Sequence, residues 1–378
     1  FGMKRLVFLT ALLCLAVFAF AGGAQGDDAS ATRQVAPGPF GKYDPPIEVN
    51  FVGTLSDNMQ KNVIRNDNSF EDNMWSRIYL ERLGIKINYQ WIAKNPEEYD
   101  QKLNVSLAAA DILETQPTQL KRLFESDLIA TLDDVYEEYM SPRVKKELMG
   151  TAGEEDWLSC KFDGKLYAIP RVWVRAGESS TCFIWTRKDW LENLGLDPPT
   201  TADEMISVAK AFSEQDPDGN GKDDTYGILL KRDLWGGVGG VELFFNAFHA
   251  YPNIWIDDGK GGLTYGTIQP EVREALQALQ NLFKQDIIDK EFGVRPGDKI
   301  PEEVAAERVG MVFGPQWISL WPLPDNVNNN PEADWLPLMM VSADDKEVKP
   351  QGKIGPAGWY VVNKEYQYPE GLAKMTKL

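Results

Sequence analysis

The fold class is set by residues 47–52 (IEVNFV) and 85–89 (IKINY), where apolar and polar residues alternate. A period of two predicts a strand for each stretch. Residues 73–83, which lie between them, show helical spacing and end at Gly84. The sequence therefore opens with a β-α-β unit, whose two strands are expected to pair in parallel.

Helices and strands continue to alternate along the chain. Further helices are predicted over residues 97–110, 118–126, 133–139, 189–194, 201–214 and 270–285, with strands between several of them. This alternation indicates the α/β class. The helix after residue 201 carries its own start signal, because Thr201 and Glu204 have the spacing of a capping box. At 378 residues, the chain is long enough for two domains.

Composition excludes several function classes. Lys and Arg number 39 against 57 for Asp and Glu, giving a net charge of −18 and no basic patch, so nucleic-acid binding is not expected. A single histidine, His249, argues against histidine-based catalysis and clustered histidine metal sites. Cys160 and Cys182 either pair in an oxidising compartment or remain buried thiols; the sequence leaves both open.

The N-terminal segment has the features of a signal peptide. Basic residues at 4 and 5 precede an apolar run over 6–21, which ends in Ala-Phe-Ala and is short for a membrane span. We expect cleavage after Ala21 and a periplasmic or other extracytoplasmic location. Leu13 stands before Cys14, where a lipoprotein signal needs a small residue, so a lipid anchor is not expected. Residues 22–45 are predicted to form a linker.

Several stretches occur in an order that is typical of one family. They are 165–170 (KLYAIP), 184–191 (IWTRKDWL), 198–204 (PPTTADE), 309–317 (VGMVFGPQW) and 359–370 (WYVVNKEYQYPE). Together they resemble the extracellular solute-binding proteins of ABC importers, in the branch that includes maltose-binding protein. The longer lipoprotein-type members, which bind oligosaccharides or alginate, are more similar than maltose-binding protein itself.

The resemblance implies a type II periplasmic-binding-protein fold, in which two α/β lobes are joined by a hinge and enclose a ligand cleft. Lobe 1 is predicted from residues 46–170 and 315–378, and lobe 2 from 171–314. Family members have helices beyond the last strand, whereas this sequence stops in a helix at 373–378. The C-terminal part of lobe 1 is therefore expected to be missing.

The function implied by the resemblance is non-enzymatic. The protein would capture a carbohydrate, as a monomer, and deliver it to the permease subunits of an ABC transporter. Two alternatives remain at this stage. A polysaccharide lyase or glycosidase would also use tryptophans and calcium, although no acid–base pair is evident in the sequence. A sugar-binding partner of a chemoreceptor would share the same fold.

Residues 216–224 (DPDGNGKDD) have the spacing of a calcium loop. Oxygen-bearing side chains stand at its positions 1, 3, 5 and 9, and a backbone carbonyl at position 7 completes the set: Asp216, Asp218, Asn220, Asp224 and Lys222. The glutamate usual at position 12 is replaced by Gly227. The alternative is a solvated turn without metal. Alginate-binding members of the family, which resemble this stretch, imply a structural calcium ion.

Candidate sugar-binding residues lie in loops. Trp317 corresponds to the family's sugar-stacking position, and Trp321 would share its helix face. Trp173 and Arg171 flank the hinge, and Trp235 precedes a glycine-rich loop. Ordinary half-buried packing remains the alternative for each ring.

The loop after residues 111–113 supplies polar candidates. In the family it lies at the cleft and carries residues for sugar hydroxyls; here Gln116, Thr118 and Gln119 stand in it. The aromatic and ionic residues of the family pattern are absent, which puts maltose itself in doubt. Ordinary N-capping of the following helix by Thr118 is the alternative.

Overall fold

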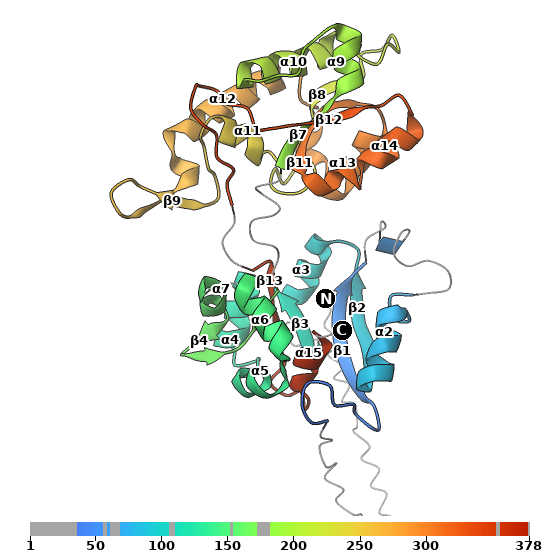
Figure 1. Cartoon of the computed structure of the whole chain (residues 1–378), viewed down its shortest axis with the longest axis vertical. Coiled ribbons are helices and arrows are strands. Elements are labelled where there is room, and N and C mark those ends of the chain that lie inside the picture. Colours follow the sequence, from blue (N-terminus) through green and yellow to red (C-terminus); the bar gives the residue numbers. More distant parts are fainter. Residues whose placement is uncertain are drawn as a thin grey trace, which may run out of the picture. The chain divides into compact units, whose positions relative to one another are not determined.

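The computed structural model describes residues 36–55, 59–60, 69–105, 110–151, 154–171, 182–352 and 356–376. They form two α/β lobes, each with its own sheets and hydrophobic core (Figure 1). Lobe 1 contains residues 36–171 and 356–376, and lobe 2 contains residues 182–352. The predicted signal peptide, Cys14 and Trp173 lie outside the described residues. Within the described ranges, no helix combines the length and apolarity needed to cross a bilayer.

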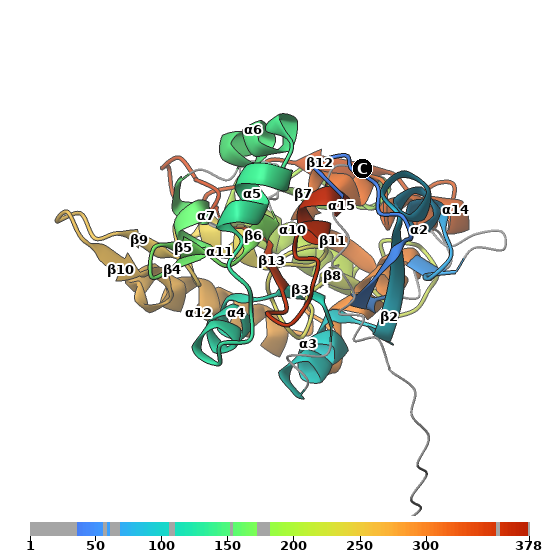
Figure 2. The same cartoon turned by 90° about the horizontal axis from the view of Figure 1, so that it is seen from below.

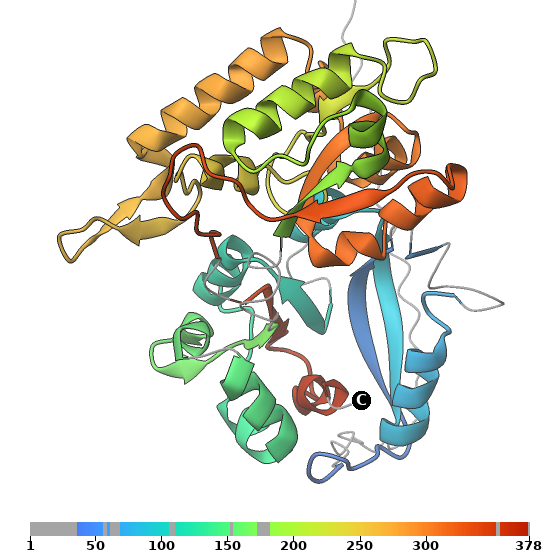
Figure 3. The same cartoon turned by 45° about the horizontal axis from the view of Figure 1, so that its top comes forward.

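Lobe 1 begins with the predicted β-α-β unit. Strand β1 (Ile47–Thr54) pairs in parallel with β2 (Ile85–Ala93), and α2 (Met74–Ile78) and a π-helical turn η1 (Tyr79–Leu83) connect them. Figure 3 shows the two long strands side by side, with the connecting helix along them. The parallel pairing predicted from the sequence is thus confirmed.

A second sheet of lobe 1 joins segments that are distant in sequence. Its order is β3 (Ile112–Thr115), β13 (Gly358–Val362) and β6 (Ile169–Arg171), all antiparallel neighbours. The remaining elements of the lobe are α3 (Pro96–Val105), α4 (Pro117–Glu125), α5 (Asp133–Tyr139), α6 (Pro142–Thr151), α7 (Glu154–Ser159), β4 (Lys161–Phe162), β5 (Lys165–Leu166) and α15 (Glu370–Met375).

Part of the predicted linker is packed against lobe 1. Tyr43 is 1% exposed, and its hydroxyl donates a 2.9 Å hydrogen bond to Glu370. The ammonium of Lys374 donates to the carbonyls of Gly38 and Gly41. The prediction of a linker over 22–45 is therefore wrong for residues 36–45, because a partner more than 300 residues away supplies their contacts.

Lobe 2 is built on a four-stranded sheet in the order β12-β7-β11-β8. The central strands β7 (Cys182–Arg187) and β11 (Val309–Pro315) are antiparallel, β8 (Tyr226–Ile228) runs parallel to β11, and β12 (Trp335–Leu338) is antiparallel to β7. The chief helices are α9 (Lys188–Leu194), α10 (Ala202–Glu214), α11 (Glu242–Ala247), α12 (Pro270–Lys284), α13 (Ile300–Ala305) and α14 (Leu323–Asn329).

Short elements complete lobe 2. The hairpin of β9 (Trp255–Asp257) and β10 (Leu263–Tyr265) projects from the lobe (Figure 2). Single 3-10 turns are η2 (Gly266–Ile268), η3 (Phe292–Val294), η4 (Gly297–Lys299) and η5 (Gln316–Ser319).

The boundary between the lobes differs from the prediction. Residues 315–352 were expected in lobe 1, but β12 extends the sheet of lobe 2 and Ile318 and Leu323 belong to its core. Gln351 is also bonded to α11 through Asn246. The chain therefore returns to lobe 1 only after residue 352, because strand pairing, and not the Gly-Pro sequence at 314–315, fixes the crossing.

Two local features hold lobe 2 together. The capping box predicted at the start of α10 is present: Glu204 N–H donates to the Thr201 hydroxyl, and Thr201 N–H donates to the Glu204 carboxylate. Arg187 is buried between Asp189 and Glu307, with its guanidinium 4.6 Å from the ring of Trp190. This ionic contact joins β7 to the segment before β11.

Candidate functional site

The candidate site lies at one edge of the sheet of lobe 2. Strands β8 and β11 are parallel, so the loops that follow them emerge at the same edge. Strand β7 is antiparallel to β11 and begins at this edge with Cys182. The chain thus enters lobe 2 here, and Gln351, close to its exit, lies here as well. Both connections to lobe 1 therefore leave from the edge that carries the loops.

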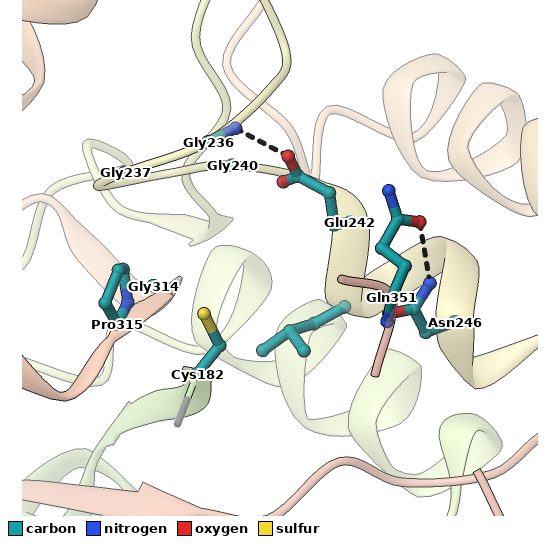
Figure 4. A pocket seen from close by; sticks show the side chains of 10 residues that line it. Cys182, Gly236, Gly237, Gly240, Glu242, Asn246, Gly314, Pro315 and Gln351 are labelled. Carbon is teal, nitrogen blue, oxygen red and sulfur yellow. Dashed lines mark hydrogen bonds between the residues drawn. The ribbon is translucent and has the colours of Figure 1, made fainter. Parts of the chain in front are cut away.

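A cavity of about 110 Å³ opens at this edge (Figure 4). Its walls come from the start of β7, the glycine-rich loop after β8, the first turns of α11, the end of β11 and the returning segment. The lining residues are Cys182, Gly236, Gly237, Gly240, Glu242, Leu243, Asn246, Gly314, Pro315 and Gln351.

Glu242 is the charged group of this lining. Its carboxylate accepts a 2.6 Å hydrogen bond from the backbone N–H of Gly236, which the dashed line in Figure 4 marks. A Cβ atom on Gly240 would lie only 2.6 Å from the other carboxylate oxygen. The glycine-rich loop is therefore needed so that backbone and carboxylate can approach each other. The glycine-rich loop is recognisable in the sequence, whereas no sequence pattern pointed to Glu242.

Asn246 and Gln351 lie beside Glu242 in the same wall, because Glu242 and Asn246 are one turn apart on α11 (Figure 4). The Asn246 amide donates to the Gln351 side chain at 3.0 Å and to the carbonyl of Ala250, and Gln351 N–H donates back to Asn246. Gln351 also donates to the carbonyl of Pro252. These bonds anchor the returning segment to α11. Because the pair joins positions 105 residues apart, no local sequence signal could have revealed it.

Three of the predicted tryptophans lie in the loops of this edge. Trp317 and Trp321 follow β11 on and after η5, are half-buried, and have nearly parallel rings with centroids 6.5 Å apart and an interplanar angle of 13°. Trp235 precedes Gly236 of the cavity and packs 5.6 Å from Phe245. The half-burial leaves part of each indole accessible, as stacking on a sugar requires.

The lobe 1 candidates follow β3 and end β6, the strands on either side of β13. Gln116 and Thr118 are exposed at the start of α4. Gln119 is buried, accepts from the Gln116 N–H at 2.7 Å and donates to Asp100 at 3.0 Å. Its amide thus caps α4 together with Gln116, whereas the alternative drawn from the sequence was capping by Thr118, which lies inside the helix.

Arg171 forms an ion pair that the sequence did not suggest. Its guanidinium lies 2.8 Å from the carboxylate of Glu114 on β3, across the middle strand β13. A Cβ on Gly358 would approach that carboxylate to 3.1 Å. The pair places a neutralised cation beside the Gln116 loop.

The two cysteines lie in different lobes and are both thiols, without a disulfide. Cys160 is fully buried in lobe 1, and burial raises the pKa of its thiol to about 12. Cys182 is partly exposed in the lobe 2 cavity.

The oxygen-bearing side chains of the predicted calcium loop lie in one turn that follows α10. Asp216, Gly219 and Gly221 have positive φ, and the Asn220 amide donates to Asp218 at 2.7 Å and to Asp224 at 3.1 Å. Burial raises the pKa of the Asp218 carboxyl, and Asp216 and Asp224 act in the same direction.

The loop fits a calcium ion in part. Four side chains bring oxygen atoms, but the nitrogen of Asn220, and not its oxygen, faces the carboxylates. In the part of the chain that the structure describes, no three acidic, histidine or cysteine side chains are arranged to hold a metal ion.

Comparison with known proteins identifies the family. A model of the family described as bacterial extracellular solute-binding protein matches residues 76–370, which is more than half of the chain. The chain belongs to this family. The resemblance seen in the sequence is thereby confirmed, and so is the expected class of fold.

Curated relatives of this solute-binding protein include two with named ligands. It is 28% identical over 242 residues to the polygalacturonan/rhamnogalacturonan-binding protein YtcQ of Bacillus subtilis, covering 62% of this chain and 45% of YtcQ. It is 25% identical over 303 residues to the fructooligosaccharide ABC transporter substrate-binding protein FusA of Streptococcus pneumoniae, covering 74% of this chain and 53% of FusA. The chain spans about half the length of these relatives.

Solved structures of the same fold are similar to this solute-binding protein. FusA of S. pneumoniae with an altered EF-hand, in complex with fructo-nystose, matches with a TM-score of 0.66 and 19% identity over 87% of this chain and 66% of that one. Alginate-binding protein AlgQ2 without calcium ion matches with a TM-score of 0.65 and 17% identity over 88% and 66%. At these identities, the similarity establishes the fold alone.

Proposed function

We propose that this protein is the substrate-binding component of an ABC importer and that it captures an oligosaccharide. The observation that carries the proposal is the edge of lobe 2, where the loops that form a cavity with a carboxylate also carry three half-buried tryptophans. Family membership and the ligands named for YtcQ and FusA support it. Sugars combine hydroxyl groups with apolar ring faces, which these two kinds of side chain recognise.

In this proposal the lobes close on the ligand. Rings of Trp317 and Trp321 stack on sugar faces, and Glu242 accepts hydrogen bonds from hydroxyl groups. Gln116 and Thr118, which are exposed in lobe 1, contact the ligand from the side of lobe 1 after closure. Closure by hinge motion would then distinguish the loaded protein for the permease.

We assign no chemical step to the site. Glycoside hydrolysis requires two carboxyl groups on either side of the scissile bond, about 5–5.5 Å or 6.5–9.5 Å apart. The described lining of the cavity contains one, Glu242. Binding without bond cleavage is the function that one carboxylate and stacking rings support.

A thermal-shift panel of oligosaccharides tests the proposal. A ligand at 100 times its Kd stabilises the folded state by about 2.7 kcal/mol, which is readily seen as a rise in Tm. The same ligand should change tryptophan fluorescence and reduce the radius of gyration in small-angle scattering. If a broad set of fructo-, gluco-, galacto- and uronate oligomers left Tm and fluorescence unchanged, the proposal would fail.

The calcium loop is the second part of the proposal. A cation bound by Asp216, Asp218 and Asp224 would relieve their mutual repulsion, with Asn220 turned to present its oxygen and Lys222 contributing its carbonyl. The EF-hand of FusA, and AlgQ2, whose structure was solved without its calcium ion, support this assignment. The ion would stabilise the turn after α10.

Its test is a melting curve with millimolar calcium and with chelator, because extracellular loops bind at roughly 10⁻⁴–10⁻³ M. Calcium should raise the Tm of the natural protein and leave Asp216→Asn/Asp218→Asn unaffected. Asp223→Asn, which changes a carboxylate outside the ligand positions, should keep the response. Identical curves with calcium and chelator would return the loop to a plain turn.

The remaining parts of the proposal concern location and assembly. We place the protein outside the cytoplasm, as a monomer released by cleavage of residues 1–21 and without a lipid on Cys14. The mass of the exported protein tests the cleavage and the absence of a lipid. An added diacylglycerol would contradict this part of the proposal and would make the protein similar to another relative, lipoprotein LipO.

A further inference from the structure

The relatives differ in the charge of the ligands they are named for. Polygalacturonan is a chain of uronic acid units, each with a carboxylate, whereas a fructooligosaccharide is uncharged. We infer that this protein selects a neutral oligosaccharide and discriminates against uronate chains. The inference rests on the proposed function, and it follows from which hydrogen-bonding groups the cavity leaves available.

The lobe 2 cavity offers an acceptor to its ligand. Among its ten described lining residues, Glu242 carries the one charged side chain. An ionised carboxylate accepts hydrogen bonds and donates none. One oxygen of the Glu242 carboxylate accepts a hydrogen bond from the Gly236 N–H. In the described contacts of Glu242, the other oxygen accepts none. A sugar hydroxyl can donate to it, whereas a uronate carboxylate cannot and adds a like charge.

Three of the four side-chain amide N–H groups of the cavity donate to acceptors within the protein. Both N–H directions of Asn246 are used, one toward Gln351 and one toward the Ala250 carbonyl. The Gln351 amide donates to the carbonyl of Pro252. A carboxylate ligand would need donors of this kind, or an arginine for a bidentate contact. The described lining contains neither lysine nor arginine.

Two of the cations near the candidate loops already have carboxylate partners. In lobe 1, Arg171 lies 2.8 Å from Glu114. In lobe 2, the largely buried Lys231 of the loop after β8 lies 3.6 Å from Asp233. A uronate would have to compete with a carboxylate that the fold holds in place. Neither cation is thus available without the loss of an ion pair.

The size of the discrimination follows from Coulomb's law. Two like charges about 6 Å apart weaken binding by between about threefold and a hundredfold, according to how far water reaches the pair. A neutral ligand avoids this penalty, and its affinity should be insensitive to salt.

The experiment uses the natural protein and two matched ligands. One is a galacturonate oligomer, and the other is the same oligomer with its carboxyl groups reduced to primary alcohols. Both are titrated calorimetrically beside neutral fructo- and glucooligosaccharides, at about 20 and 500 mM NaCl. We expect a neutral sugar as the tightest ligand, with less than a twofold effect of salt, and the reduced oligomer at least about threefold tighter than the acid wherever either binds.

The outcomes separate this inference from the proposed function. If the galacturonate oligomer is the tightest ligand and loses affinity with salt, the inference is overturned and oligosaccharide capture stands. If no saccharide of either class binds, the proposed function itself fails.

Substitutions assign the preference to Glu242. In Glu242→Gln the neutral ligand should bind roughly tenfold more weakly, because a charge-assisted acceptor is lost, and the disadvantage of the acid oligomer should shrink. Glu332→Gln, at an exposed carboxylate before β12, should change neither. A Glu242→Gln protein with the natural affinity and the natural discrimination would contradict the role of this carboxylate. The titrations of the natural protein decide the charge preference even if the variant does not fold.

Discussion

Replacement of Trp317 by alanine should weaken ligand binding about thirtyfold and leave the protein folded. The ring follows β11, is half-buried, and lies nearly parallel to Trp321 with a 6.5 Å separation. Truncation of a central aromatic anchor commonly costs about 2 kcal/mol of binding free energy, or roughly thirtyfold in Kd. Trp317→Phe keeps a ring for stacking and should cost about 1 kcal/mol, roughly fivefold.

The effect on stability can be bounded from burial. Removal of a fully buried tryptophan side chain costs about 3–5 kcal/mol of unfolding free energy, so a half-buried ring should cost about 2 kcal/mol. Part of the Trp317 ring packs on the small core around Ile318 and Trp185. The variant should therefore remain folded at 25 °C while its ligand affinity falls.

The assay is calorimetric titration of the best oligosaccharide at a temperature where denaturant curves show each variant folded. Trp190→Phe is the matched control, because Trp190 is fully buried against Phe212 and lies outside the cavity. It should lower the unfolding free energy and leave Kd unchanged. If Trp317→Ala behaved like this control, Trp317 would be a core residue and the ligand would bind elsewhere.

Two further predictions concern stability. Arg187→Met leaves Asp189 and Glu307 without their buried cation and should lower the unfolding free energy, measured in urea, by about 3 kcal/mol. Lys188→Met, at an exposed ion pair, should lower it by less than about 1 kcal/mol. Equal effects of the two substitutions would refute the role of the buried network. Hydrogen bonds from Thr200 and Thr201 hold the pKa of Glu204 below its usual range, so its contribution is present above pH of about 4.3 and is lost as pH falls through the lowered pKa. The Tm difference between the natural protein and Glu204→Gln should therefore shrink from pH 7 toward pH 3, and a constant difference would contradict the capping role.

Local patterns in the sequence predicted the elements well. Alternation in 47–52 and 85–89 was enough for β1 and β2, and the Thr201–Glu204 spacing located the start of α10. These signals work because periodicity and capping depend on residues within one or two turns. The family resemblance then supplied the fold.

Features that depend on distant partners escaped the sequence. Tyr43 looked like part of a linker because its hydroxyl partner is Glu370. The sequence predicted the lobe boundary at residue 315, because no local pattern in β12 indicates that this strand pairs with β7. Glu242, Asn246 and Gln351 come together only through the fold, whereas the loops that carry Trp235 and Trp317 could be located because they follow recognisable strands.

Alkylation of Cys182 tests most directly whether the ligand binds at the lobe 2 cavity. This thiol lines the cavity and is partly exposed, whereas Cys160 is fully buried with its pKa raised to about 12 and serves as the internal control. Iodoacetamide labelling at pH 8, followed by peptide mass spectrometry, should modify Cys182 in the native protein and Cys160 only after denaturation. A stabilising oligosaccharide at 100 times its Kd should slow the labelling of Cys182 by up to about a hundredfold. If the ligand raises Tm but Cys182 is labelled at the same rate, the ligand does not occupy this cavity and the central claim is wrong.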